Sequence, residues 1–200
     1  MAMRFKQAVF TLLALSAFSG VAEAHTGHGG TTGFAAGFLH PLSGLDHLLA
    51  MVAVGLLAAR LGGKALWAVP AAFIGMMAVG GALGMNGFSL PMVEFGIAAS
   101  VIVLGAAVAL DFSLPISSTM GLVGFFAIFH GHAHGSEVPL AVSSLSYGFG
   151  FVMATALLHC MGLGLGLSIM RATGTRSSGI VKMAGAAMAA AGVGLMAGLI

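Results

Sequence analysis

Apolar runs long enough to cross a lipid bilayer follow one another through most of this chain, with only short breaks between them. A helix needs about 20 predominantly apolar residues to span the hydrocarbon region. Charged residues make up only 6% of the sequence, against about 25% in soluble domains. A soluble core could not bury so much apolar surface, so the sequence predicts an all-α membrane protein with the lipid bilayer as its outer solvent.

Turn signals such as Gly62-Gly63 and Asn86-Gly87 mark the breaks between the apolar runs. No break is long enough to form another domain, so residues 25–200 are expected to fold as a single bundle of six transmembrane helices. The helices are expected near 33–59, 65–85, 90–110, 115–134, 139–170 and 178–199.

Residues 1–24 have the order of a cleavable signal peptide: a basic start, an apolar run, and then Ala22-Glu23-Ala24 as the cleavage pattern. An uncleaved signal anchor is the alternative. Basic residues cluster in the first and fifth loops, which the positive-inside rule assigns to the cytoplasm. Both signals predict a multi-pass protein of the bacterial inner (cytoplasmic) membrane with a periplasmic mature N-terminus. The basic loop residues are Arg60, Lys64, Arg171, Arg176 and Lys182.

The most informative polar group inside an apolar run is His40-Pro41-Leu42-Ser43-Gly44-Leu45-Asp46-His47. Ionisable residues are rare in membrane helices unless they face a partner, a cavity or an ion. On one continuous helix His40, Gly44 and His47 would share a face, with Gly44 leaving room between the imidazoles. Asp46 would orient an imidazole of another helix, or enter the site through a kink at Pro41. A His–Asp pair that only joins helices is the alternative.

A second motif is the stretch 129–137, which contains three histidines and an acid. On a helix His130, His134 and Glu137 share one face, while His132 points elsewhere. Nitrogen and oxygen donors at this spacing suit nickel, cobalt or zinc. A surface histidine tract, which would respond to pH, is the alternative.

Four further residues are candidates for metal binding. His25 would chelate a metal with the new terminal amine and His28, unless this segment is only a glycine-rich tether. Glu94 would attract a cation, or else stabilise a helix N-terminus. His159 would continue the path inward along a stripe of small residues, or form an interhelical hydrogen bond. The single cysteine excludes an internal disulfide framework.

The paired motifs HPLSGLDH and FHGHAHGSE, together with Glu94 and a mature terminus that begins with histidine, resemble the HupE/UreJ family of hydrogenase- and urease-accessory membrane proteins. The resemblance extends over essentially the whole chain. It implies a nickel permease that serves a nickel enzyme, with either urease or hydrogenase as the client. It also implies a set of functional residues that Glu94 assists. That set is His40, Asp46, His47, His130, His134 and Glu137.

These observations predict a permease that imports Ni²⁺, or Co²⁺, from periplasm to cytoplasm, and not an enzyme. The chain has no ATP-binding loop, and neither an organic cofactor nor nucleic acid is expected. A divalent ion gains about 4.6 kcal/mol on moving inward through 100 mV, at about 2.3 kcal/mol per charge. A membrane metal sensor or accessory protein, or a membrane metalloenzyme or haem protein, is the alternative. Helix faces made of small residues are also compatible with packing between copies of the chain, that is, with a homo-oligomer.

Overall fold

The computed structural model describes residues 33–176 and 178–200, where it shows seven helices and no strand. The predicted signal peptide, with His25 and His28 just after it, lies outside these residues. The all-helical prediction is confirmed for the described part of the chain. The helices are α2 (Gly33–Ser43), α3 (Leu45–Leu61), α4 (Ala65–Met85), α5 (Val93–Ala109), α6 (Ile116–Ser136), α7 (Ser144–Thr173) and α8 (Gly179–Met196).

The prediction of one continuous helix over 33–59 is wrong. The chain breaks at Gly44, and helices α2 and α3 meet there at a bend of 83°. Gly44 has an extended backbone, with φ −93° and ψ 120°, which no helical residue adopts. His40 and His47 therefore lie on different helices and do not share a helix face.

Side chains satisfy the backbone groups that this break leaves without helical partners. The Ser43 hydroxyl donates to the carbonyl of His40 at 2.6 Å. The backbone N–H of His47 donates to the Asp46 carboxylate at 2.7 Å. Because backbone groups at helix ends lack partners within the helix, these bonds stabilise the bend that the Gly44 backbone starts.

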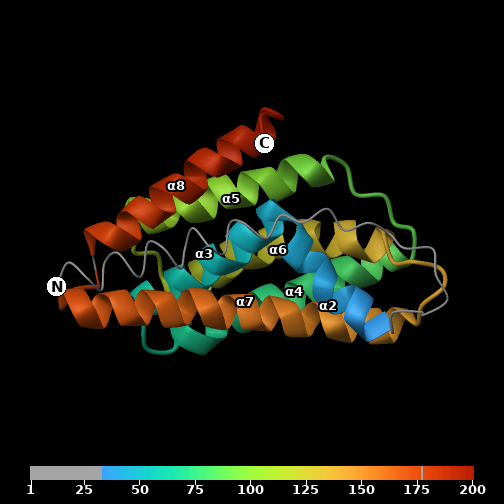
Figure 1. Cartoon of the computed structure of the whole chain (residues 1–200), viewed down its shortest axis with the longest axis horizontal. Helices are drawn as coiled ribbons and strands as arrows, with labels where there is room; N and C mark the ends of the chain where they lie inside the picture. The colour runs from blue at the N-terminus through green and yellow to red at the C-terminus, as the bar shows by residue number, and fades with distance from the viewer. Residues whose placement is uncertain (1–32, 177) are drawn as a thin grey trace. The chain divides into compact units, whose positions relative to one another are not determined.

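Helix α3 forms the centre of the bundle. All residues from Ala50 to Arg60 are buried, as expected for a helix that is apolar on every face. It contacts α4, α5 and α7, while α2 lies against α7 (Figure 1). Helix α3, which begins at the bend, is thus surrounded by other helices of the chain.

Two other close pairs complete the bundle: α4 lies along α6, and α8 lies along α5 (Figure 1). Glycines make the first pair possible. An added Cβ at Gly131 would overlap the carbonyl of Met77, and one at Gly80 would overlap the carbonyl of Ile128. Small residues allow membrane helices to approach this closely. Gly80 and Gly84 therefore both face α6 of the same chain.

A Gly131→Ala variant is expected to lower the free energy of unfolding by about 1–3 kcal/mol, because the methyl group overpacks a backbone contact. Gly121→Ala is the matched control on the same helix, since nothing lies within 4 Å of its added Cβ. The control should be neutral or slightly stabilising, because alanine favours helices. Denaturation of both variants in detergent micelles measures the difference. Equal stability of the two variants would contradict this account of the α4–α6 contact.

The loops gather at two ends of the bundle. At one end Arg60 and Lys182 both pair with Asp111, at 2.6 Å and 3.5 Å. The first, third and fifth breaks therefore lie at the same end of the bundle. At the other end the His132 ring N–H donates to the carbonyl of Phe88 at 2.6 Å, which joins the second break to the end of α6.

By length and hydropathy, three helices among the described residues could cross a membrane: α4, α7 and α8. The bent pair α2–α3 makes a fourth candidate if it counts as one span, and α5 is a shorter apolar helix. These helices identify a membrane protein. The count of six spans and the orientation stay predictions.

Candidate metal site

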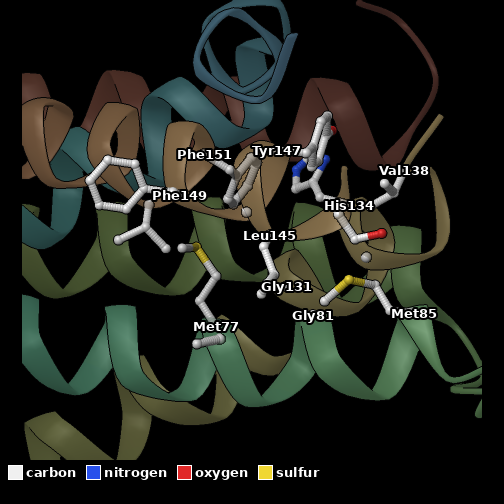
Figure 2. A pocket seen from close by; sticks show the side chains of 15 residues that line it. Met77, Gly81, Met85, Gly131, His134, Val138, Leu145, Tyr147, Phe149 and Phe151 are labelled. Carbon is white, nitrogen blue, oxygen red and sulfur yellow. The ribbon is translucent and has the colours of Figure 1, made fainter. Parts of the chain in front are cut away.

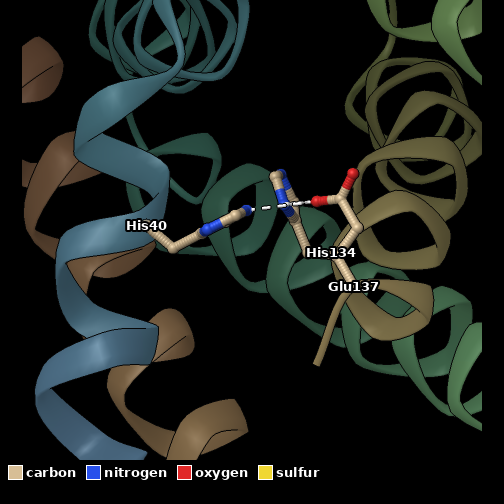
Figure 3. A group of neighbouring side chains, drawn as sticks. All are labelled: His40, His134 and Glu137. Carbon is tan, nitrogen blue, oxygen red and sulfur yellow. Dashed lines mark ion pairs between the residues drawn. The ribbon is translucent and has the colours of Figure 1, made fainter. Parts of the chain in front are cut away.

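Three side chains that could bind a metal meet at the end of α6 where Glu137 lies; we call His40, His134 and Glu137 the mouth site (Figure 3). One donor atom from each lies within 4.8 Å of the other two. His40 Nε2 is 3.3 Å and His134 Nδ1 is 3.7 Å from the same Glu137 carboxylate oxygen. The Glu137 side chain is 56% exposed and that of His40 34%, whereas that of His134 is only 16% exposed. The mouth site therefore opens to the surroundings.

Behind the mouth site lies a second group, His47, His130 and His134, which we call the buried cluster. His47 Nδ1 is 3.2 Å from His130 Nδ1 and 3.2 Å from His134 Nε2. His47 and His130 are essentially inaccessible, at 1% and 0% exposure. Two nitrogens bound to one ion at about 2.1 Å lie about 3.0–3.4 Å apart in octahedral or tetrahedral geometry. The spacing therefore suits a shared divalent ion as well as a shared proton.

The two groups share His134, which uses a different ring nitrogen for each. Its ring lies between those of His40 and His47, with ring centres 4.7 Å and 4.9 Å away. This arrangement depends on the 83° bend, because α2 and α3 bring their histidines to His134 from different directions. The structure thus joins the two sequence motifs, but through a broken helix instead of a common helix face.

Hydroxyl groups that the sequence analysis did not single out as site residues contact the buried cluster. Ser100 Oγ lies 2.8 Å from His130 Nε2, and Thr155 Oγ1 lies 3.5 Å from His47 Nε2. Both residues are fully buried. Ser100 had one sequence signal, since it is a polar residue inside the apolar run that follows Glu94, and intramembrane polar groups usually have partners.

The two predicted carboxylates of the apolar runs lie elsewhere. Asp46 and Glu94 line a separate cavity of about 260 Å³ with Phe95, Leu195 and Met196. Asp46 also accepts the backbone N–H of His47, so its carboxylate stabilises the helix start. Neither of the orientations expected for Asp46, towards the imidazoles or behind one of another helix, is among the contacts that the structure shows.

The remaining predicted histidines differ from one another. His132 faces away from the cluster, as expected, and bonds to Phe88. His159 is 1% exposed, and neither of its ring nitrogens has a hydrogen-bond partner within the described residues. The ring of Phe73 packs 5.2 Å from the ring of His159 and 5.7 Å from that of His130. Phe73 is therefore the side chain that contacts both the buried cluster and the inner histidine.

A second cavity, next to His134, is not a place for an ion. It measures about 340 Å³ and lies between α4, α6 and α7, with apolar walls that include Met77, Met85 and Phe151 (Figure 2). His134 reaches its edge. An ion needs polar groups in place of its water, and this cavity supplies few of them. The donor groups follow the line from the mouth site to the buried cluster.

The fold and the site together define a helical membrane protein with a histidine-rich site that extends from an exposed mouth into the bundle. Its nitrogen donors are able to hold a borderline divalent metal. The chain belongs to the HupE/UreJ family, whose members are accessory to hydrogenase and urease: the sequence model of the HupE / UreJ protein family matches residues 13–195.

A curated relative supports this assignment. The chain is 46% identical to Protein HupE of Rhizobium leguminosarum bv. viciae over 197 residues, which cover 98% of this chain and 100% of the relative. No solved structure matches the chain. The family assignment confirms the resemblance that the paired motifs carry.

Proposed function

We propose that this protein is a permease that imports Ni²⁺, with Co²⁺ as a second substrate, from periplasm to cytoplasm for the maturation of a urease or hydrogenase. One observation carries the proposal. Metal-binding groups continue without a gap from the exposed Glu137 and His40 through His134 to the fully buried His47 and His130. Family membership supports the link to a nickel enzyme.

The mouth site captures the ion. Glu137 supplies the negative charge that attracts a hydrated cation, and His40 supplies nitrogen, which nickel prefers more strongly than magnesium or manganese does. We assign Asp46 and Glu94 a longer-range part, because two carboxylates in one cavity add to the negative field. His25 and His28 remain candidates for an earlier capture step.

His134 transfers the ion inward. Its Nδ1 faces Glu137 and its Nε2 faces His47, so the ion exchanges one nitrogen of the same ring for the other. Because a neutral imidazole has one lone pair, the ring hydrogen leaves Nε2 in this step and returns on Nδ1, where it can donate to the Glu137 carboxylate. The buried cluster contains no carboxylate, and neutral imidazoles leave the double charge of the ion uncompensated. The ion can therefore leave this cluster again, which passage through a series of sites requires.

The last step takes the ion past Phe73 to His159. Phe73 contacts both histidine rings, so its side chain must move before an ion reaches the unpartnered nitrogens of His159. An inside-negative potential drives this passage, since it lowers the free energy of a divalent ion by about 4.6 kcal/mol per 100 mV. No ATP-binding loop is present to supply another source of energy.

Uptake of labelled nickel into proteoliposomes tests the proposal. Wild-type protein should give saturable uptake that rises with an inside-negative potential and falls with competing cobalt. His40→Ala should reduce uptake at low nickel about tenfold, because the mouth site loses one of its two nitrogens. Cys160→Ala is the control, since Cys160 is exposed on α7 outside both sites.

The same assay separates the permease from its rivals. A metal sensor or storage protein would bind nickel but give no flux above that of empty liposomes. Competition by zinc or copper that exceeds competition by cobalt would change the assigned substrate and not the transport function. Absence of flux in the wild type, with nickel bound, would overturn the permease assignment.

A further inference from the structure

A single hydroxyl group stands behind the most buried imidazole of the cluster. Ser100 Oγ lies 2.6 Å from the carbonyl oxygen of Ile97 and 2.8 Å from His130 Nε2. The serine is 0% exposed, so no bulk water competes for these contacts. The hydrogen bonds of one hydroxyl therefore determine how the ring of His130 is protonated.

The carbonyl of Ile97 can only accept a hydrogen bond, and a serine hydroxyl has only one hydrogen to donate. At 2.6 Å from that carbonyl, the Ser100 hydroxyl must donate there, because two unshielded oxygens would repel each other. Ser100 Oγ is then left to accept a hydrogen bond from His130. Consequently His130 carries its hydrogen on Nε2.

A neutral imidazole has one N–H and one nitrogen with a free lone pair. With the hydrogen of His130 on Nε2, the lone pair is on Nδ1, the nitrogen that faces His47 Nδ1 at 3.2 Å. Metals bind the neutral ring through such a lone pair. His130 therefore presents a ready donor atom to the centre of the buried cluster.

His47 is not held in this way. Its Nε2 lies 3.5 Å from Thr155 Oγ1, and the Thr155 hydroxyl can instead donate to the sulfur of Met77 at 3.7 Å. Thr155 can therefore either donate to His47 or accept from it, and it suits both neutral forms of the ring. The hydrogen of His130 is therefore held on Nε2, whereas the hydrogen of His47 can be on either ring nitrogen.

We propose that Ser100 is a positioning residue of the metal path: its hydroxyl holds His130 in the Nε2–H form and so directs the Nδ1 lone pair at the passing ion. This inference rests on the proposed function for the identity of the ion. Partners that orient a ligating histidine typically contribute 10–100-fold, that is about one to two orders of magnitude, to metal affinity. Ser100 would thus tune the buried cluster without touching the metal.

The test combines nickel binding with NMR of the imidazole nitrogens, on full-length protein in nanodiscs. Ser100→Ala should weaken Ni²⁺ binding about tenfold, and Ser100→Thr, which keeps the hydroxyl, should restore it to within about twofold of the wild type. Thr119→Ala is the matched control. Thr119 is also buried and donates to a backbone carbonyl, that of Pro115, but no histidine contact is among its interactions.

The NMR measurement separates positioning from general damage to the fold. With ¹⁵N-labelled histidine and no metal, His130 of the wild type should show only the Nε2–H form, whereas Ser100→Ala should show a mixture. A His130→Gln variant identifies the signals. Nδ1–H as the main form in the wild type, or unchanged nickel affinity in Ser100→Ala, would overturn the inference. Because neither measurement involves flux, a failure of the permease proposal would be seen separately in the proteoliposome assay.

Discussion

A His47→Gln variant is expected to lose nearly all nickel uptake and to bind Ni²⁺ at least about 100-fold more weakly than the wild type. His47 Nδ1 is the atom that lies 3.2 Å from both His130 and His134. Loss of this ring removes a donor from the centre of the path and separates the mouth site from the buried residues. The effect should therefore exceed that of losing a residue that only orients a ligand.

His132→Gln is the matched control for this variant. His132 is on the same helix as His130 and His134, yet it bonds to the carbonyl of Phe88, and a glutamine amide can also donate to a carbonyl. The control should keep uptake and nickel affinity within about twofold of the wild type, because glutamine can keep the hydrogen bond to Phe88 and the side chain contacts neither site. Equal losses in the two variants, measured by uptake and by equilibrium binding, would show that the buried cluster is not the path.

An Asp111→Asn variant is expected to lower the free energy of unfolding by about 3–5 kcal/mol. The Arg60 side chain is only 4% exposed, and its guanidinium donates to Asp111 at 2.6 Å and to the carbonyl of Phe112. Removing the carboxylate leaves a buried charge with no opposite charge beside it. Asparagine tolerates the left-handed backbone at this position, where φ is 59°, so the loss reports on the charge.

Two further variants test this explanation. Arg60→Met should cost less than Asp111→Asn, because it removes the buried charge and leaves Asp111 33% exposed beside Lys182. Lys182→Gln should cost at most about 1 kcal/mol, since a half-exposed ion pair contributes little. Stability is measured by denaturation in mixed micelles. If all three variants lose the same free energy, buried charge is not the cause.

The Arg60–Asp111 ion pair and the buried cluster lie at opposite ends of α3. Arg60 is in its last turn and pairs with Asp111 in the loop after α5, which also pairs with Lys182 in the first turn of α8, while His47 is in the first turn of α3. Fixing one end allows the bend at Gly44 to hold His40 and His47 in place at the other. Because the ion pair and the histidines are at different ends of α3, Asp111→Asn should lower the free energy of unfolding while the protein that remains folded keeps its nickel affinity.

Local patterns in the sequence determined most helix positions. Apolar runs, with turn signals between them, predicted the ends of α4 to α8 to within five residues, the largest difference being the start of α7 at Ser144 instead of 139. Span length and turn chemistry are properties of short segments, which is why they can be read from the sequence. Local patterns also identified the histidines and Glu137 as candidates, because ionisable groups are costly to bury in an apolar chain. Their roles stay predictions until the metal assays are made.

Only the tertiary structure decided how these groups meet. Periodicity along a helix tells which residues share a face, but it carries no information on the angle at which two helices cross. The extended backbone of Gly44 ended one helix and began another, and the bend brought His40 and His47 to His134 from two directions. Asp46 instead stabilises the new helix start, although its position in the motif suggested the site.

The supporting residues depend on the fold for the same reason. Ser100 lies on α5 and contacts His130 on α6, and Thr155 lies on α7 and contacts His47 on α3. Phe73 lies on α4 and contacts His130 on α6 and His159 on α7. A hydroxyl or a phenyl ring in an apolar run has no local signature that names its partner. The sequence determined where most helices lie and which residues are candidate donors, and packing between distant segments determined which of those donors lie together.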